Sequence, residues 1–583
     1  DSMEPMEKNR SFPGFQIYHS IFEEIFNYTL ILPFNIVSKA FTGCKSFSEF
    51  KLFVKNHNSS QGMQLKGRYY TPRIISQFIV NQTLQNIELT GKSTILDLCA
   101  GTGSFAIQIC QKLYQMYTEK TLNLTPLEIK KRIVKIHLRT IDIDPIATYI
   151  LRIQLLLWYF ESEPNSSQAQ DFLSELLKAT KIGNVFEVPE LFDEKFDYII
   201  SNPPYISEKS NKRYIDQMIK NKDSEFYKAR IDFYLHFLAY AFEHVKPKGT
   251  MGFITPSYFL DTKSASAIRE HLFNYTSKIC YYEYGDRPLF SKAPGFHSCV
   301  FVCKNDANQQ SKKKILTYSD QINQKSRVMI YSDVFHRDFD YMMKFTPKPD
   351  FKELESYTHS LREIAEIRQG VVPGPDRFRK KYYSLLQNEN LNLNQGVFVL
   401  SNDEIASLKL RPNEITYFLP FSYVRDLKRN EYLHKVNFQS IHQIIYLNNF
   451  EINEDELPNI FNHLQQFKII MTARRENQTG KRKWFELHWP RMKNIFTNPR
   501  LVCIRRTDKP RFIHIEIPLV TDLATNIIIP KNPMDIKKLY NYLISPKVTE
   551  WMTYYAKNKG KMLQIDKSIL EKIPIPNNLS HNT

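Results

Sequence analysis

Short apolar runs that end in turn-forming residues recur through the first half of the chain. The clearest are residues 95–98 before Cys-Ala-Gly-Thr-Gly, residues 136–143 running into Asp-Ile-Asp-Pro at 142–145, and residues 196–200 before Ser-Asn-Pro-Pro-Tyr. Runs of this length that stop at glycine or proline are typical of buried strands. A helix is predicted to begin near Ser104, directly after the glycine turn. The pattern therefore predicts an α/β fold.

Further along, residues 232–245 carry aromatic and apolar side chains at helical spacing. Residues 251–254, 281–290 and 296–303 are predicted strands, the last two forming the final hairpin of the sheet. Between the Asn-Pro-Pro-Tyr motif and the helix, residues 207–228 are polar and rich in lysine, which favours a mobile loop. The catalytic domain is expected to end near Lys304.

The Asn-Pro-Pro-Tyr motif, residues 202–205, places unusual chemistry at the end of a strand. Two consecutive prolines cannot continue a β-ladder, because neither has an N–H to donate. One amide side chain, several backbone carbonyls and an aromatic ring remain, which suits a planar ring bearing an amino group. A lone motif of this kind is more often a capped loop, so its interpretation depends on the glycine motif upstream.

In the glycine motif, Gly101 and Gly103 allow the backbone to approach a ligand closely, and the helix that follows offers unpaired N–H groups. A dinucleotide-binding fingerprint has a third glycine, where this chain has Ala106, a residue which that fingerprint tolerates. Asp97, before the turn, would repel a diphosphate. It favours a ligand that carries a cationic group.

The two motifs together resemble those of S-adenosylmethionine-dependent amino-methyltransferases. Their order, with the glycine motif first and a long C-terminal region last, resembles the gamma class (TaqI-like) of DNA adenine-N6 methyltransferases of type II restriction-modification systems. The resemblance covers roughly residues 65–575 and extends to modification enzymes acting on ATCGAT. It implies a Rossmann-like mixed seven-stranded methyltransferase sheet with helices on both faces, plus a C-terminal α+β target-recognition domain.

The resemblance also implies a set of cofactor contacts. Tyr70 and Thr71 match a segment that lies against the methionine end of S-adenosylmethionine, although a plain helix start, with Thr71 as its cap, is the simpler interpretation. Asp142, at the end of the second strand, would accept from the ribose hydroxyls. Asn184 stands where family members often have Asp for the adenine amino group, and Phe237 stands where they sandwich the adenine. The predicted cofactor-binding residues are Tyr70, Thr71, Asp97, Ala100, Gly101, Gly103, Asp142, Asn184 and Phe237.

The predicted catalytic residues are Asn202, Pro203, Pro204, Tyr205 and Phe290. The side-chain oxygen of Asn202 and the carbonyl of Pro203 are expected to accept both N–H bonds of the target amine. Tyr205 and Phe290 are expected to stack on a base flipped out of the duplex, which contributes roughly 1–3 kcal/mol per base.

Charge and composition restrict the partners. The chain has 583 residues, enough for two or more domains, and 79 Lys and Arg against 61 Asp and Glu give a net charge of +18. This excess favours a polyanion, and nucleic acid more than a membrane surface. No apolar run approaches the ~20 residues that span a bilayer. Seven scattered cysteines and no signal pattern favour a cytoplasmic protein, and no metal is called for.

Five regions are predicted: an N-terminal helical segment (1–64), the catalytic domain (65–304), a connector (305–360), a DNA target-recognition domain (361–532) and a C-terminal helical segment (533–583). In the fourth region, basic and aromatic residues interleave. A charge run is usually only a solvated face, but this mixture favours phosphate contacts with a few base contacts. The predicted DNA-binding residues are Arg474, Arg475, Lys481, Arg482, Lys483, Trp484, Arg505 and Arg506.

The expected activity is therefore methylation of adenine N6 in double-stranded DNA by a monomer, paired with a separate restriction endonuclease. Two alternatives stay open. A protein-glutamine N5 or RNA N6-adenine methyltransferase would use the same amide-type motif. A non-catalytic DNA-specificity protein would require a broken motif, whereas both motifs are intact.

Overall fold

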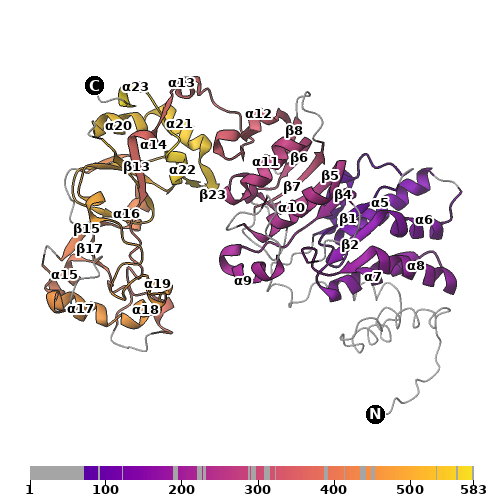
Figure 1. Ribbon diagram of the computed structural model, residues 1–583, viewed down its shortest axis with the longest axis horizontal. Helices are drawn as coiled ribbons and strands as arrows, with labels where there is room; N and C mark the ends of the chain where they lie inside the picture. Colours follow the sequence, from indigo (N-terminus) through magenta and orange to yellow (C-terminus); the bar gives the residue numbers. More distant parts are fainter. Residues whose placement is uncertain are drawn as a thin grey trace, which may run out of the picture. The chain divides into compact units, whose positions relative to one another are not determined.

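The computed structural model describes residues 71–580, apart from 90–91, 121–122, 188–194, 220–225, 227–230, 286–288, 290–296, 307–314, 322–323, 386–390, 412–413, 434–441, 448–453, 533–534 and 560–561. The chain divides into two compact units, Asp1–Pro347 and Lys348–Thr583 (Figure 1). The predicted N-terminal helical segment, residues 1–64, lies outside the described residues.

A mixed sheet forms the centre of the N-terminal unit. Its strands are β1 (Ile95–Asp97), β2 (Leu138–Asp142), β3 (Thr180–Ile182), β4 (Phe196–Ser201), β5 (Val245–Pro256), β6 (Thr276–Glu283), β7 (Ser298–Asn305), β8 (Ile315–Asp320) and β9 (Lys325–Ile330). Their order is β3-β2-β1-β4-β5-β7-β6-β8-β9. The first five are parallel, and β7 runs antiparallel to both β5 and β6. All three residues of β1 are buried, as expected for a central strand of a covered parallel sheet.

The predicted number of seven strands is wrong, because the described sheet has nine. β8 pairs parallel with β6, and β9 pairs antiparallel with β8. Both strands lie in the range 305–360 that we predicted to be a connector. Most side chains of β9 are exposed, so its sequence carries little of the apolar signal that marks a buried strand. The domain boundary shifts accordingly, since the first unit continues to Pro347.

Helices pack against this sheet in several groups. They are α4 (Arg73–Thr83), α5 (Ser104–Lys120), α6 (Pro126–Arg132), α7 (Pro145–Phe160), α8 (Ser166–Ala179), α9 (Glu208–Met218), α10 (Phe233–His244) and α11 (Ser266–Tyr275). α4 contacts α5 and β5, α7 contacts β2 and β3, and α10 and α11 contact each other and the strands β5 and β6. The predicted helix start at Ser104 is confirmed, and α10 falls within the predicted range 232–245.

The predicted loop at 207–228 is wrong for its first half, which forms α9. Lys212 pairs with Glu208 and with Asp216, each four residues away, and such pairs stabilise a helix. Ile215 is buried on the inner side. The many charges that favoured a loop are thus the exposed side of an amphipathic helix.

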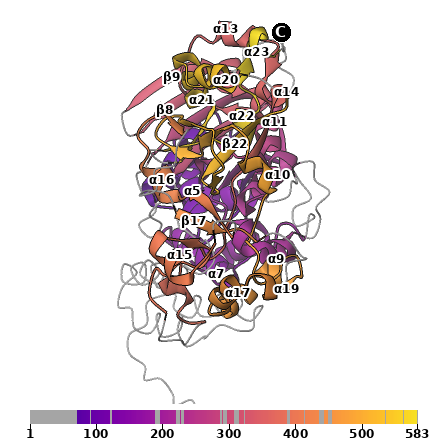
Figure 2. The ribbon, with the colours of Figure 1, turned by 90° about the vertical axis from the view of Figure 1, so that its left-hand side faces the viewer.

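The C-terminal unit combines small sheets with short helices. Its larger sheets are β13-β22-β18-β20-β16 and β14-β17-β15-β21. Their strands are β13 (Ala365–Gln369), β14 (Val399–Leu400), β15 (Ile415–Leu419), β16 (Glu431–Leu433), β17 (His442–Ile445), β18 (Arg500–Ile504), β20 (Phe512–Ile515), β21 (Val520–Thr521) and β22 (Thr525–Pro530). Two views show α20 (Ile536–Leu543) and α21 (Pro546–Tyr555) at one end of this unit, and α15 (Asn402–Leu408) and α17 (Pro458–Gln465) at the other (Figures 1 and 2).

The predicted C-terminal helical segment is only partly helical. Besides α20, α21, α22 (Lys567–Leu570) and α23 (Asn577–Ser580), residues 533–583 contain the short strands β23 (Lys557–Lys559), β24 (Met562–Gln564) and β25 (Pro574–Ile575). β24 pairs with β19 (Arg506–Thr507), and β25 pairs with β12 (His359–Ser360). Within the described ranges, no helix is both long enough and apolar enough to cross a bilayer.

Candidate functional site

A pocket lies in the N-terminal unit where β1, β2, β3 and β4 end. The space between its walls, counted together with its open mouth, is about 990 Å³. The strand order reverses between β1 and β4, and ligands of open α/β sheets bind at such a point, outside the carboxyl ends of the strands. Four loops line it, at 98–101, 141–144, 183–185 and 202–204, together with side chains of α9 and α10.

The two glycines of the first loop have different surroundings. Both have positive φ, 53° at Gly101 and 98° at Gly103. Gly101 and its neighbour Ala100 line the pocket, as predicted for a close backbone approach. Gly103 does not line the pocket. A Cβ atom there would lie 2.5 Å from Cδ1 of Leu151, so Gly103 is needed for packing against α7.

Asp97 lies under the glycine loop and not in the pocket wall. Its side chain is fully buried, and its Oδ2 accepts from the backbone N–H of Ala106 at 3.1 Å. Burial, partly offset by that bond, raises the pKa of Asp97 to about 8. The carboxyl is therefore largely protonated at neutral pH, so the expected direct attraction to a cationic ligand lacks support. In the structure, this hydrogen bond stabilises the first turn of α5.

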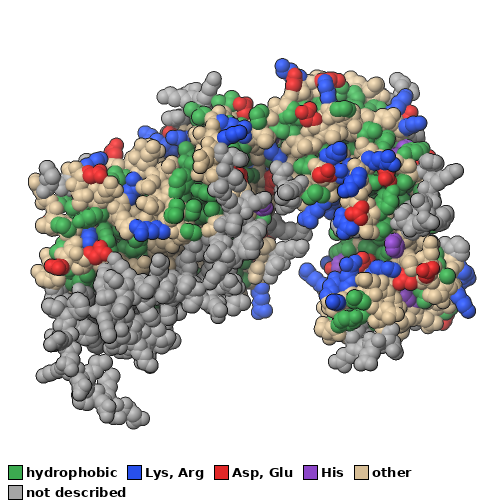
Figure 3. All heavy atoms as spheres, turned by 180° about the vertical axis from the view of Figure 1, so that it is seen from behind, with side chains coloured by type: hydrophobic (Ala, Val, Ile, Leu, Met, Phe, Trp, Pro, Cys, Tyr) green, Lys and Arg blue, Asp and Glu red, His purple; other side chains and the backbone are tan. Residues whose placement is uncertain are grey.

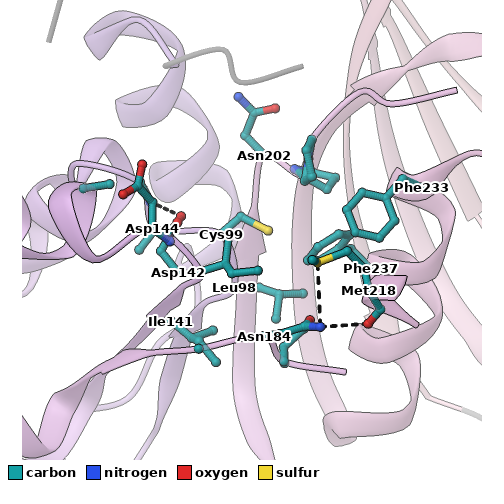
Figure 4. Close-up of a pocket in the computed structure, with 18 of the residues that line it drawn as sticks. Leu98, Cys99, Ile141, Asp142, Asp144, Asn184, Asn202, Met218, Phe233 and Phe237 are labelled. Atoms are coloured by element: carbon teal, nitrogen blue, oxygen red, sulfur yellow. Dashed lines mark hydrogen bonds between the residues drawn. The ribbon is translucent and has the colours of Figure 1, made fainter. Parts of the chain in front are cut away.

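Two carboxylates lie on one side of the pocket, opposite the rings of Phe233 and Phe237 (Figure 4). Asp142 accepts from the N–H of Gly101 at 2.8 Å through Oδ2 and from the N–H of Asp144 at 2.8 Å through Oδ1. Asp142 thus ties the second loop to the glycine loop. A carboxylate has about four acceptor sites, so the predicted ribose contact is compatible with both bonds. Asp144 lines the same wall.

The opposite wall is aromatic. Phe237 meets Phe186 and Phe233 with ring centroids 4.8 and 5.1 Å apart, both in T-shaped arrangements. Asn184 lies below them, where its Nδ2 donates to the carbonyl of Met218 at 2.7 Å and its Oδ1 accepts from the N–H of Phe186 at 3.2 Å. Phe233 and Met218 line the pocket although neither was predicted as a site residue. Phe233 stands four residues before Phe237 on one helix, a spacing that could have identified it.

Asn202, Pro203 and Pro204 all line the pocket, so the structure brings the two motifs together at one site. The Nδ2 of Asn202 donates to Oγ1 of Thr71 at 3.0 Å. Tyr205, in contrast, does not line the pocket. It is 7% exposed, its ring meets that of Tyr234 edge to face, and burial raises its pKa well above the usual value.

Cys99 was also missed, although it lines the pocket between the two motifs. Burial and the nearby Asp142 carboxylate raise the pKa of its thiol well above the usual value. The reactive form of cysteine is the thiolate, so this side chain is a neutral wall of the pocket and not a nucleophile. Two predicted site residues, Tyr70 and Phe290, lie outside the described residues.

In the C-terminal unit, the predicted DNA-binding residues divide into two groups. Arg475, Lys481 and Arg506 are exposed. Arg474 is not: its guanidinium donates to the carbonyls of Met471, Lys483, Trp484 and Glu486 at 2.8–3.5 Å, which closes the loop between α19 (Arg475–Gln478) and residue 486.

Arg505 is also held within the unit, by the carbonyl of Leu523 at 3.1 Å and the carboxylate of Asp566 at 3.5 Å. Arg482 lies 3.9 Å from Glu486, and Trp484 is partly buried against Phe461. Lys483 is half-buried beside Phe485. Figure 3 shows Lys and Arg side chains spread over the visible face of this unit, with Asp and Glu among them.

Comparison with known proteins gives these two units a context. Residues 137–290 match the family model described as Eco57I restriction-modification methylase. The chain is 20% identical over 473 residues to the Type II restriction enzyme and methyltransferase RM.Eco57I of Escherichia coli, covering 71% of this chain and 46% of that protein. It is 23% identical over 432 residues to the Type II methyltransferase M.HindII of Haemophilus influenzae, covering 65% of this chain and 74% of that one. The chain thus spans about half of the first relative and three quarters of the second.

Solved structures show the same fold. The Type IIL restriction-modification enzyme MmeI in complex with DNA is similar with a TM-score of 0.54 at 12% identity, over 86% of this chain and 65% of that chain. A nuclease-deletion mutant of the Type ISP restriction-modification enzyme LlaGI, in complex with a DNA substrate mimic, is similar with a TM-score of 0.52 at 14% identity, over 96% and 52% of the two chains. At these identities the similarity concerns the fold alone.

Proposed function

We propose that this chain is a site-specific DNA methyltransferase that moves a methyl group from S-adenosylmethionine to N6 of an adenine flipped out of double-stranded DNA. One observation carries the proposal: Asn202, Pro203 and Pro204 share a pocket with Gly101 and Asp142. The match of residues 137–290 to a methylase family and the methyltransferase relatives support it.

The pocket suits the proposed cofactor. Its acidic side, Asp142 and Asp144, offers acceptors to a hydroxylated ribose, and its aromatic side, Phe233 and Phe237, offers rings to a flat base. Between them, the backbone at Gly101 leaves room for a close approach. When bound there, S-adenosylmethionine supplies an electrophilic methyl group on its sulfonium. Thr71 and Asn202, which are hydrogen-bonded to each other, also line the pocket. We place the transferred methyl at their end of it.

The residues at that end make an aromatic amine reactive. The lone pair of an exocyclic amine is delocalised into its ring, which makes the nitrogen a poor nucleophile. Acceptance of one N–H bond by the oxygen of Asn202 and of the other by the carbonyl of Pro203 localises that lone pair. Such fixed acceptors stabilise the charge that develops in the transition state. The proton leaves after the methyl has moved, so no strong base is needed.

The rest of the proposal concerns the DNA. Flipping the base costs a few kcal/mol, and stacking on Phe290 would offset roughly 1–3 kcal/mol of it. Arg475, Lys481 and Arg506 are the proposed phosphate contacts, because all three are exposed. We propose a monomer that methylates a palindrome one strand at a time in the cytoplasm, with ATCGAT as its site. The mark would protect that site from a restriction endonuclease.

Single-molecule sequencing of DNA incubated with the protein and S-adenosylmethionine tests the proposal. The expected result is N6-methyladenine within one short motif, and ATCGAT if the proposed site is right. Omission of the cofactor is the matched control. Transfer of label to protein or RNA, with unmarked DNA, would overturn the proposal and favour a protein-glutamine or RNA methyltransferase.

A further inference from the structure

We propose that Thr71 is a positioning residue that holds the amide of Asn202 in its productive orientation, and this inference rests on the proposed function. The sequence predicted Thr71 as a cofactor contact or as the cap of a helix. The structure shows a different partner. Nδ2 of Asn202 donates to Oγ1 of Thr71 at 3.0 Å, across 131 residues of sequence.

The start of α4 explains why this hydroxyl is available. The helix begins at Arg73, and Pro72 occupies the cap position, with no side-chain hydrogen bond to the helix end. Thr71 therefore stands one residue too early to cap α4. Its side chain is 6% exposed and lines the pocket, where it reaches the Asn-Pro-Pro-Tyr loop.

The helix behind Thr71 is a rigid support. Ile79 and Val80 are buried in the core, and Thr83 lies so close to β5 that a Cβ on Gly252 would fall 2.0 Å from its hydroxyl oxygen. α4 also contacts α5, β4 and β7. A group attached to a packed element is held more accurately than one on an exposed loop.

The chemistry of an amide makes such a support useful. A terminal amide has an oxygen on one side and an NH2 group on the other, and rotation by 180° exchanges them. An incoming amine presents N–H groups and needs the oxygen. The NH2 group then faces Thr71, whose hydroxyl can accept. Without an acceptor there, the productive orientation would lose the hydrogen bond that distinguishes it from the rotated one.

Three substitutions separate this role from others. Thr71→Val removes the acceptor but keeps the shape, and we expect it to lower kcat for DNA methylation about tenfold with little change in the affinity for S-adenosylmethionine. Thr71→Ser keeps the hydroxyl and should restore most of the rate. Thr83→Val is the matched control, since it removes a buried hydroxyl of the same helix that bonds only to the carbonyl of Ile79 in the described contacts. It should lower stability but not kcat.

The outcomes are distinct. An unchanged kcat in Thr71→Val would overturn the inference. If kcat is unchanged but S-adenosylmethionine binds more weakly, the result would favour a direct contact between Thr71 and the cofactor. Failure of the wild type to methylate DNA would refute the proposed function instead. Neutron crystal structures of the wild type and of Thr71→Val, in which the amide nitrogen with its hydrogens differs from the oxygen, then decide the inference without any activity measurement. The Asn202 amide should rotate or take two orientations in the variant, and an unmoved amide would contradict the positioning role.

Discussion

The polar residues of the two units are arranged in different ways. In the N-terminal unit, three strand ends bring Asn202, Asp142 and Asn184 to one pocket. In the C-terminal unit, the arginines of the densest basic segment lie partly in the interior and partly on the surface of that unit. Strand ends of a parallel sheet meet at one edge, so the topology itself gathers the first set. No comparable rule directs a run of charges along loops and short helices. The position of a polar residue relative to a strand end thus carries more functional information than the local density of charge.

Substitution of Asn202 tests this comparison with the largest expected effect. Asn202→Ala removes the acceptor proposed to stabilise the reacting amine, and loss of one such group costs about 10²–10³-fold in rate. Single-turnover methyl transfer should fall by that factor, while DNA affinity in a binding titration stays the same. An equal loss of DNA affinity and rate would place Asn202 in binding and not in catalysis.

Adjacent arginines offer the sharpest test in the C-terminal unit. Arg474→Gln should lower the free energy of unfolding by about 1–3 kcal/mol, because several part-buried carbonyls lose their donor. Arg475→Gln should leave stability unchanged and reduce the slope of log affinity for DNA against log salt by about 1. Chemical denaturation and binding titrations at several salt concentrations measure both. If the two variants changed stability and DNA affinity in the same way, the assignment of Arg474 to the interior and Arg475 to the DNA-binding surface would be wrong.

Asn184→Asp tests whether the aromatic side of the pocket depends on a bond to α9. The substitution replaces the donor to the Met218 carbonyl with a second acceptor, so the end of α9 should loosen. We expect affinity for S-adenosylmethionine to fall about tenfold, since the part-buried carbonyl of Met218 loses a hydrogen bond, which is typically worth about 1 kcal/mol. Asn211→Asp adds the same charge at an exposed position of α9 and should have no effect. Tighter binding by Asn184→Asp would favour the direct adenine contact predicted from the sequence.

A further expected effect concerns Asp97 and pH. Its pKa is about 8 in the folded protein against 3.8 as the ordinary value, so between these values the folded state binds one proton more than the unfolded state. Stability contributed by this group is therefore lost as pH rises through that window. The Tm of Asp97→Asn minus the Tm of the wild type should therefore become more positive from pH 5 to pH 8. Calorimetry without cofactor measures this difference. A constant difference would show that Asp97 keeps an ordinary pKa.

Much of the N-terminal unit follows from its sequence, because the relevant signals are local. Apolar runs closed by glycine or proline marked β1, β2 and β4, and the residues just beyond them line the pocket. The features that the sequence did not predict depend on contacts between residues far apart in the chain. The hydrogen bond of Thr71 to Asn202, the burial of Tyr205 and the carbonyls around Arg474 involve partners that no local pattern reveals.

The strands at one edge of the sheet, β8 and β9, were not predicted for a related reason. β8 and β9 contribute few buried side chains, so their sequence lacks the alternation that identifies a strand. The same holds for α9, whose exposed charges concealed a helix. Elements at the margin of a core are defined by their neighbours more than by their own composition.

Among the described strands, β9 lies at the outer edge of the sheet, which has a consequence for the protein in crowded solution. An exposed edge strand can pair with the edge of another molecule and start aggregation. On β9, Val328 and Ile330 are exposed, but Lys325 and Arg327 interrupt the strand with charge, and Arg327 lies over the ring of Tyr318 with its guanidinium carbon 4.9 Å from the centroid. These two cations act as gatekeepers against fibril-like pairing. Their replacement by β-branched apolar residues would turn the last strand of the sheet into a nucleus for self-association.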